Sequence, residues 1–142
     1  MINVCAYHFS VHAGPHGKLV ALEGQGDIPF DIKRVYYIYD VDKEKRRGYH
    51  SHVDLCQMLI CVSGSVKVQV KTPFEDETHE LNDPCQGLYI GPMIWREMFD
   101  FSPGAVLLVL AGGRYDESDY IRDYEKYVSL ATGYFRKGDA VE

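Results

Sequence analysis

The chain has 142 residues and no pair of cysteines at C-x-x-C spacing. Its four cysteines are Cys5, Cys56, Cys61 and Cys85, and none of them stands with histidines at the spacing of a zinc finger. Cys56 and Cys61 lie on a short apolar run, which predicts buried thiols, because free cysteine is among the most buried residue types. This usage of cysteine indicates a reduced compartment.

The sequence also lacks long hydrophobic runs. None approaches the roughly 18 residues of a membrane-spanning helix. The segment Met1–Cys5 has no basic stretch followed by a long apolar one, so we expect no signal peptide. These absences predict a cytoplasmic protein without a membrane partner.

An excess of basic residues is missing as well. The formal net charge is −6 at neutral pH, which disfavours a general role in nucleic-acid or membrane-surface binding. Hydrophobic residues make up 46% and charged residues 25% of the chain, as in ordinary globular proteins. At this length we predict a single domain over residues 1–142.

Short strands separated by Gly, Pro and Asn turns dominate the pattern. Residues 65–71 (SVKVQVK) alternate cleanly, and residues 105–111 (AVLLVLA) form a continuous apolar run. In residues 33–40 (KRVYYIYD), alternation places Arg34, Tyr36 and Ile38 on one face. About ten such strands predict an all-β fold, a closed or sandwiched antiparallel barrel over about residues 18–112.

The pattern changes after Gly113. Acidic residues are followed by apolar and aromatic residues that recur at helical spacing. These apolar and aromatic residues are Tyr120, Ile121, Tyr124 and Tyr127. We therefore predict a short C-terminal helix over about residues 116–130, which packs against the barrel.

The most informative stretch is residues 46–52 (RRGYHSH). His50 and His52 stand at i and i+2, so on a strand they project from the same face. Two imidazoles at this spacing suit either a metal site or proton transfer near neutral pH.

The spacing Gly48-x-His50-x-His52-x4-Gln57-x6-Gly64 closely resembles the first motif of the cupins, a family of small β-barrels that often hold a divalent metal. Residues 92–97 (PMIWRE) resemble the second motif. The resemblance implies a glutamate ligand where Gln57 stands and a histidine ligand where Glu97 stands. Glutamine is a poor ligand for transition metals, so we predict no metal, although His50, His52 and Glu97 could still form a facial triad.

Four longer segments narrow the resemblance: RVYYIYDV, RGYHSH, GLYIGPMIWREMFDFS and YDESDYIRDY. They are similar to the dTDP-4-keto-6-deoxyglucose 3,4-ketoisomerases, and the similarity covers about residues 18–127. The resemblance implies a jelly-roll barrel, a homodimer with exchanged N-terminal strands, and no cofactor. It also implies a dTDP-linked 4-keto-6-deoxy sugar as substrate, with His50 and His52 as the catalytic residues that move protons through an enediol.

Arginine forks bind phosphate oxygens well, so Arg34 and Arg47 are our candidates for the diphosphate. Tyr36, on the Arg34 face, is a candidate for contact with the sugar or the phosphate, and Trp95, the only tryptophan, is a candidate for the wall of the pocket. The complete predicted set of substrate-binding residues is Arg34, Tyr36, Arg47, Gln57, Trp95, Arg96, Glu97 and His16.

Two of these residues bear on the product. Family members that make a 6-deoxygalactose product typically have W-H-E in the second motif and an arginine before the glycine of the early turn. This chain has Arg96 and His16 at those positions. The resemblance therefore implies the gluco product, dTDP-3-keto-6-deoxyglucose.

Three other functions stay open at this level. A 3,5-epimerase would act on the same kind of substrate. A metal-dependent cupin dioxygenase would contain stoichiometric iron or zinc. A non-catalytic sugar-nucleotide-binding cupin would bind dTDP without exchanging protons of the sugar with solvent.

Overall fold

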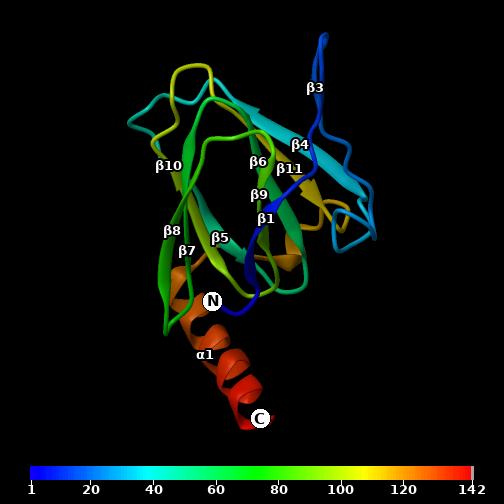
Figure 1. Cartoon of the computed structure of the whole chain (residues 1–142). Helices are drawn as coiled ribbons and strands as arrows, with labels where there is room; N and C mark the ends of the chain where they lie inside the picture. Colours follow the sequence, from blue (N-terminus) through cyan, green and yellow to red (C-terminus); the bar gives the residue numbers. More distant parts are fainter. Residues whose placement is uncertain (142) are drawn as a thin grey trace.

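The computed structural model describes residues 1–141, with side chains described as far as Arg136. Two five-stranded antiparallel sheets face each other (Figure 1). The first sheet has the order β1 (Val4–His8), β9 (Gln86–Ile90), β6 (Gln57–Ser63), β11 (Val106–Ala111) and β4 (Arg34–Tyr39). The second has the order β12 (Tyr120–Ile121), β5 (Arg47–His52), β10 (Trp95–Phe99), β7 (Val66–Lys71) and β8 (Asp76–Leu81). The predicted all-β barrel architecture is confirmed, and its first sheet includes β1, N-terminal to the predicted barrel boundary.

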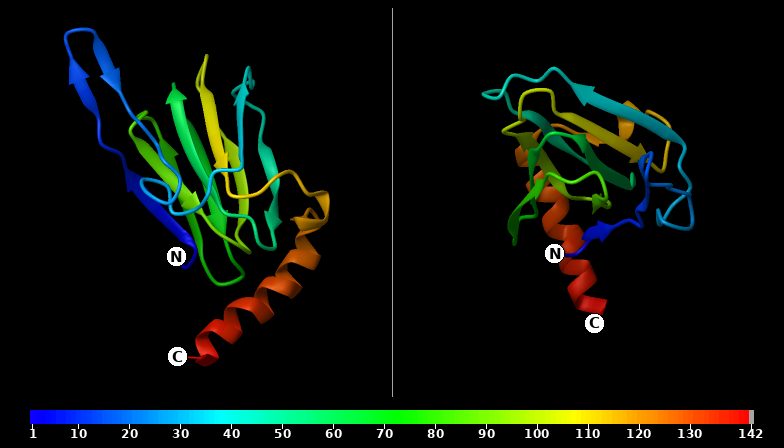
Figure 2. Two further views of the ribbon diagram at one scale, coloured as in Figure 1. Left: turned by 90° about the vertical axis from the view of Figure 1, so that its right-hand side faces the viewer. Right: turned by 45° about the horizontal axis from the view of Figure 1, so that its top comes forward.

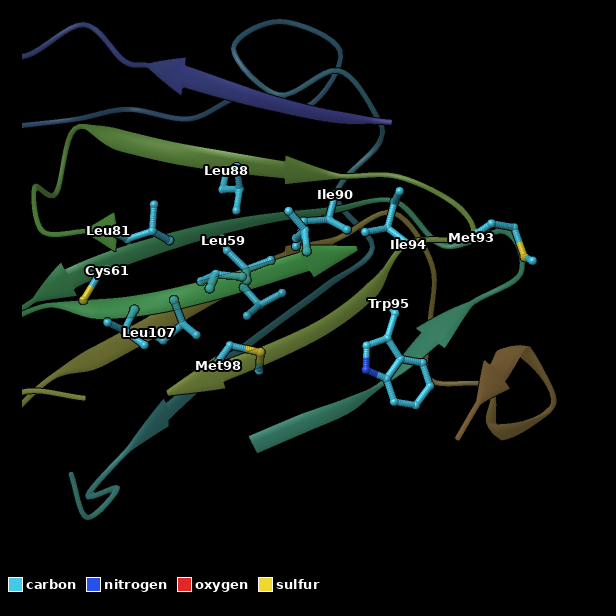
Figure 3. Packing of buried hydrophobic residues seen from close by; sticks show 14 of the residues in the cluster. Leu59, Cys61, Leu81, Leu88, Ile90, Met93, Ile94, Trp95, Met98 and Leu107 are labelled. Carbon is cyan, nitrogen blue, oxygen red and sulfur yellow. The ribbon is translucent and has the colours of Figure 1, made fainter. Parts of the chain in front are cut away.

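The inward faces of the two sheets form the main core. Val66, Val68 and Val70 alternate inward along β7, as the sequence pattern predicts. The first sheet contributes Leu59, Leu88 and other residues that meet them between the sheets (Figure 3). Burial on this scale supplies most of the stabilisation of a small domain.

The outer face of the first sheet is partly covered by the chain itself. Ile28 and Phe30, from the loop that precedes β4, pack against Met58, Ile60 and Leu110. Because β6 and β11 are buried on both faces, their sequences are continuous apolar runs. The outer face of β4 is not covered in this way: Val35, Tyr37 and Tyr39 are exposed.

β2 (His12–Gly14) and β3 (Gly17–Leu19) form a hairpin that pairs with neither large sheet. It projects away from the barrel (Figure 2), and all its residues are exposed. We call residues 10–20 the N-terminal arm.

The C-terminal segment differs from the prediction. The helix α1 covers Tyr124–Val141, so it begins later and is longer than the predicted 116–130. The 3₁₀ turn η1 covers Glu117–Asp119, and β12 pairs with β5. Residues 120–121 supply hydrogen-bond partners to the backbone groups at the edge of β5. This pairing is preferred to the helix that the local spacing of apolar residues favours. Asp123 then accepts hydrogen bonds from the backbone N–H groups of Glu125 and Lys126, which starts the helix.

None of the helices in the described part of the chain has the length and hydrophobicity needed to cross a membrane.

Candidate active site

His50 and His52 lie on the inward face of β5, and their ring centroids are 5.0 Å apart. A bulge in the pairing of β5 with β10 directs them there. Gly48 has φ of 96°, and a Cβ at this position would lie 2.8 Å from the carbonyl oxygen of Arg96. Only glycine combines this backbone conformation with so close an approach. In the motif Gly-x-His-x-His, the glycine therefore permits the backbone conformation of the bulge, and the two histidines supply the imidazoles.

Each imidazole has its Nδ1 held by an oxygen atom. Nδ1 of His50 lies 3.1 Å from the carbonyl oxygen of Gly48, and Nδ1 of His52 lies 3.1 Å from Oδ2 of Asp119. Nε2 of His52 is buried and has no hydrogen-bond partner among the described residues. Because a carbonyl or carboxylate oxygen only accepts, the proton of each neutral ring is placed on Nδ1.

Arg96 lies directly opposite His50 across the β5–β10 pairing, and its side chain is buried in the barrel. Its guanidinium donates to Oε1 of Gln57 and to the carbonyl oxygen of Ile94, while its Nε has no partner. Gln57 in turn donates from Nε2 to the hydroxyl of Tyr36 at 3.0 Å. Three of the predicted site residues therefore form one hydrogen-bonded chain inside the barrel.

Burial, followed by the charge of Arg96, lowers the pKa of His50 to about 4 and that of His52 to about 2. Burial also lowers the pKa of Arg96, to about 10, so it remains a cation at neutral pH. The resting site thus combines two neutral imidazoles, which can accept protons, with one buried positive charge.

Two cavities open beside the histidines. The larger, of about 580 Å³, is lined by His52, Asp119, Tyr120 and Arg34, and also by residues of the segments 54–56 and 112–116. The smaller, of about 350 Å³, is lined by His50, Tyr36, Tyr120 and three arginines. Arg34 and Tyr120 line both cavities. The ring of Tyr120 lies 5.1 Å from that of His50 and 4.3 Å from that of His52.

The three arginines of the smaller cavity are Arg34, Arg47 and Arg122. Nε and Nη2 of Arg34 are buried without hydrogen-bond partners in the described part of the chain. Buried N–H groups without partners are unfavourable unless a ligand satisfies them. This cluster is therefore suited to an anionic group with several oxygen atoms.

Trp95 and Glu97 do not join the site. Register with β7 places Arg96 beside the inward Val70, so Trp95 and Glu97 face outward. Trp95 lies 5.0 Å from the ring of Tyr124, on α1, and donates from its indole nitrogen to Glu97. Burial opposes ionisation of Glu97, but hydrogen bonds from Arg46 and Trp95 outweigh it and hold the pKa of the carboxyl below its usual value.

The facial triad of His50, His52 and Glu97 that the sequence left open is consequently not formed. Among residues 1–136, no three or more His, Cys, Asp or Glu side chains are grouped so that they could hold a metal ion.

His16 lies in the turn between β2 and β3, at the tip of the N-terminal arm. It lines neither of the two cavities beside the histidines. Within one chain, His16 is therefore separated from the other predicted site residues.

Asp119, Tyr120 and Arg122 are not among the site residues predicted from the sequence, because the helical spacing predicts a helix over their segment. Pairing of β12 with β5 instead places Tyr120 opposite His52. The available signal was local: Asp116 followed by Ser118 is typical of a capped turn, and Asp116 does accept hydrogen bonds from Ser118.

Comparison with known proteins agrees with this geometry. A curated relative from Aneurinibacillus thermoaerophilus, TDP-4-oxo-6-deoxy-alpha-D-glucose-3,4-oxoisomerase, is 48% identical over 111 residues, which cover 78% of this chain and 80% of the relative. A histidine-to-asparagine variant of the 3,4-ketoisomerase QdtA from Thermoanaerobacterium thermosaccharolyticum, solved with TDP-4-keto-6-deoxyglucose, superimposes with a TM-score of 0.92 at 56% identity. That match covers 94% of this chain and 96% of the QdtA chain.

The TDP-quinovose 3,4-ketoisomerase WlaRB from Campylobacter jejuni has a TM-score of 0.88 at 43% identity, over 91% of this chain and 99% of its own. A family model described as FdtA, WxcM-like, C-terminal, matches residues 3–132. The resemblance to the ketoisomerases noted in the sequence is thereby confirmed, and the chain belongs to the FdtA family of WxcM-like, C-terminal proteins.

Proposed function

We propose that this chain is a 3,4-ketoisomerase that acts on dTDP-4-keto-6-deoxyglucose, with His50 and His52 as its catalytic residues. The observation that carries the proposal is the pair of neutral imidazoles, 5.0 Å apart, beside Arg34 and Arg96, which form no ion pair with a carboxylate among the described residues. The names of the QdtA and Aneurinibacillus relatives support the substrate class.

The reaction moves the oxidation level from carbon 4 to carbon 3 within the sugar, while the enzyme takes up and returns protons that can exchange with solvent. One imidazole removes the proton from carbon 3, adjacent to the ketone at carbon 4, which gives an enediolate. The proton of the carbon 3 hydroxyl passes to the oxygen on carbon 4, and a proton is returned to carbon 4 itself. The ketone has then moved from carbon 4 to carbon 3, and no electrons leave the sugar, so no redox partner is consumed.

Arg96 supplies positive charge where the enediolate develops. Because it is buried and lacks an anionic partner among the described residues, its field is weakly screened and already oriented before the reaction. Gln57 holds the guanidinium, and Tyr36 holds Gln57. These three residues would therefore contact or support the sugar, while Trp95 and Glu97 would stabilise the sheet beneath α1.

Arg34 and Arg47 would bind the diphosphate. Arg122, which is paired with Glu117, lines the same cavity and is not among the site residues predicted from the sequence. Several guanidinium groups match the geometry and charge of a diphosphate better than one group alone.

For the stereochemistry we propose the gluco product, dTDP-3-keto-6-deoxyglucose. Arg96 occupies the position at which the galacto branch of the family typically has histidine. The relative WlaRB, which is named for quinovose, the 6-deoxy form of glucose, supports this assignment.

We further propose a homodimer in which each N-terminal arm packs against the partner. The supporting features are the projecting hairpin and the uncovered aromatic face of β4, on which Tyr37 is 62% and Tyr39 59% exposed. Exposed apolar patches of this kind mark interaction surfaces. Exchange of the arms would also give His16 a route to the site of the other subunit.

The proposed function is tested by incubating the protein with dTDP-4-keto-6-deoxyglucose in deuterated buffer and following the sugar by NMR. We expect conversion to the 3-keto product with deuterium at carbon 4, and strongly reduced conversion with His50→Asn or His52→Asn. Exchange at carbon 5 would instead indicate a 3,5-epimerase. Tight binding of dTDP without any exchange would indicate a non-catalytic binding protein.

A further inference from the structure

The segment 116–123, for which the spacing of the sequence predicts a helix, instead places the carboxylate of Asp119 beside His52. We infer that Asp119 is a positioning residue for the ketoisomerisation: it fixes the proton of His52 on Nδ1 and so keeps Nε2 bare and ready to accept a proton. This inference rests on the proposed function, but its central statement, the tautomer of His52, can be measured without substrate.

Asp119 is attached at several points to the end of β5 and to the two residues that follow it. Oδ2 lies 3.1 Å from Nδ1 of His52, and Oδ1 accepts a hydrogen bond of 2.9 Å from the backbone N–H of Asp54. Its own carbonyl oxygen accepts from the backbone N–H of Val53 at 3.0 Å. The carboxylate is thus held in one orientation, with one oxygen for the backbone and the other for the imidazole.

This arrangement selects one tautomer. A carboxylate oxygen can only accept, so Nδ1 must carry the proton, and the lone pair of Nε2 stays free. Nε2 is buried and has no partner among the described residues, and His52 lines the larger cavity. A free acceptor atom next to that cavity is what a general base requires.

Asp119 also matters once His52 has taken a proton. The imidazolium would be disfavoured by burial and by the nearby cations Arg96, Arg34 and Arg122. The only anion hydrogen-bonded to His52 in the described part of the chain is Asp119. His50, in contrast, is oriented by the neutral carbonyl oxygen of Gly48. The two histidines therefore differ in the charge of the group behind them.

Asp119→Asn is the informative variant. The backbone N–H of Asp54 needs an oxygen acceptor and would retain the single amide oxygen of the asparagine. The amide NH₂ would then face Nδ1 of His52, which favours the tautomer with its proton on Nε2. We expect the ¹⁵N spectrum of the His52 ring, recorded on protein without substrate, to show the protonated nitrogen moving from Nδ1 to Nε2.

The same variant should lose turnover. General acid–base catalysis contributes about 10²- to 10⁴-fold, so we expect kcat to fall by about 10²-fold or more while KM changes little. The matched control is Asp100→Asn, because Asp100 pairs with Lys43 and Lys67 and does not contact either histidine. That control should keep both the wild-type His52 tautomer and the wild-type kcat.

Asp119→Ala distinguishes loss of the carboxylate that orients His52 from a general loss of folding. It retains the backbone bond to Val53 but leaves space beside the larger cavity, which Asp119 lines. Formate, a free carboxylate, should partly restore kcat in this variant, and formamide, a neutral molecule of similar shape, should not. If Asp119→Asn does not fold, the comparison of formate with formamide in Asp119→Ala tests the role of the carboxylate.

A wild-type His52 with its proton on Nε2 would overturn the inference, as would an unchanged tautomer in Asp119→Asn. Loss of activity in Asp119→Ala that formate and formamide restore equally would also overturn it, because the carboxylate charge would then be irrelevant. If the wild-type tautomer is as inferred but the protein does not isomerise the sugar nucleotide, the proposed function fails and the assignment of the tautomer stands.

Discussion

Arg96 donates a hydrogen bond from its guanidinium to Gln57 inside the barrel, and no carboxylate of the described residues forms an ion pair with it. A buried cation that is bonded only to neutral oxygens costs free energy, because burial removes its hydration. The same arrangement leaves its charge available to an anionic intermediate. The amide of Gln57 is therefore suited to holding Arg96 without neutralising it.

Gln57→Glu should reduce turnover without unfolding the protein. The new carboxylate would pair with Arg96 and cancel much of its field at the enediolate, so we expect kcat to fall by about 10-fold or more. The buried ion pair should leave the melting temperature equal to or above that of the wild type. Gln86→Glu, at the half-buried start of β9 and outside both cavities, is the matched control. A variant with wild-type kcat would show that the charge of Arg96 does not act on the reaction.

The stability of the protein should decrease in mild acid. Burial, followed by Arg96, lowers the pKa of His50 to about 4 from an unfolded value near 6.5. Between these values the unfolded chain binds the additional proton, so the free energy of unfolding falls as the pH falls through this window. His50→Gln should remove up to about 1.4 kcal/mol per pH unit of that slope. Urea denaturation between pH 4 and pH 7 measures it, with His12→Gln in the arm as control. An unaltered slope in His50→Gln would contradict the assignment.

Gly48→Ala should distort the site as well as destabilise the fold. The left-handed backbone conformation costs about 1–3 kcal/mol for a residue with a side chain, and the new Cβ would in addition lie 2.8 Å from the carbonyl oxygen of Arg96. We expect a lower melting temperature and a reduced kcat, since the bulge directs His50. Gly104→Ala shares a positive φ but has no atom within 4 Å, so it reports backbone strain alone. Equal effects of the two substitutions would argue against the role of the close approach.

Tyr37→Lys should weaken the proposed dimer. Tyr37 is 62% exposed on the outer face of β4, so a lysine there costs an isolated chain little but would place a charge in an apolar interface. Light scattering coupled to size exclusion should show a shift from dimer to monomer. Phe74→Lys, at an exposed residue of the β7–β8 turn, provides the control. A wild-type monomer, or a dimer unaffected by Tyr37→Lys, would refute this surface as the interface.

The sequence by itself determined which side chains share a face within a strand. Alternation in residues 34–39 and 66–71 predicts the inward residues, because successive side chains of a strand point to opposite sides. The same rule aligns His50 with His52. It also forbids the adjacent residues Arg96 and Glu97 from both facing the histidines. The predicted set of substrate-binding residues contained both, taken from the motif rather than from the geometry.

Only the tertiary structure decided which of that pair faces inward, because the answer depends on the register of β10 with β7, two strands far apart in the sequence. It likewise decided that residues 120–121 pair with β5 instead of starting a helix, and so brought Asp119 to His52. Local periodicity specifies what a segment can form. Which of those structures forms depends on the backbone N–H and C=O groups that a strand distant in sequence leaves without partners. Here the unpaired edge of β5 selects the strand β12, which completes the site.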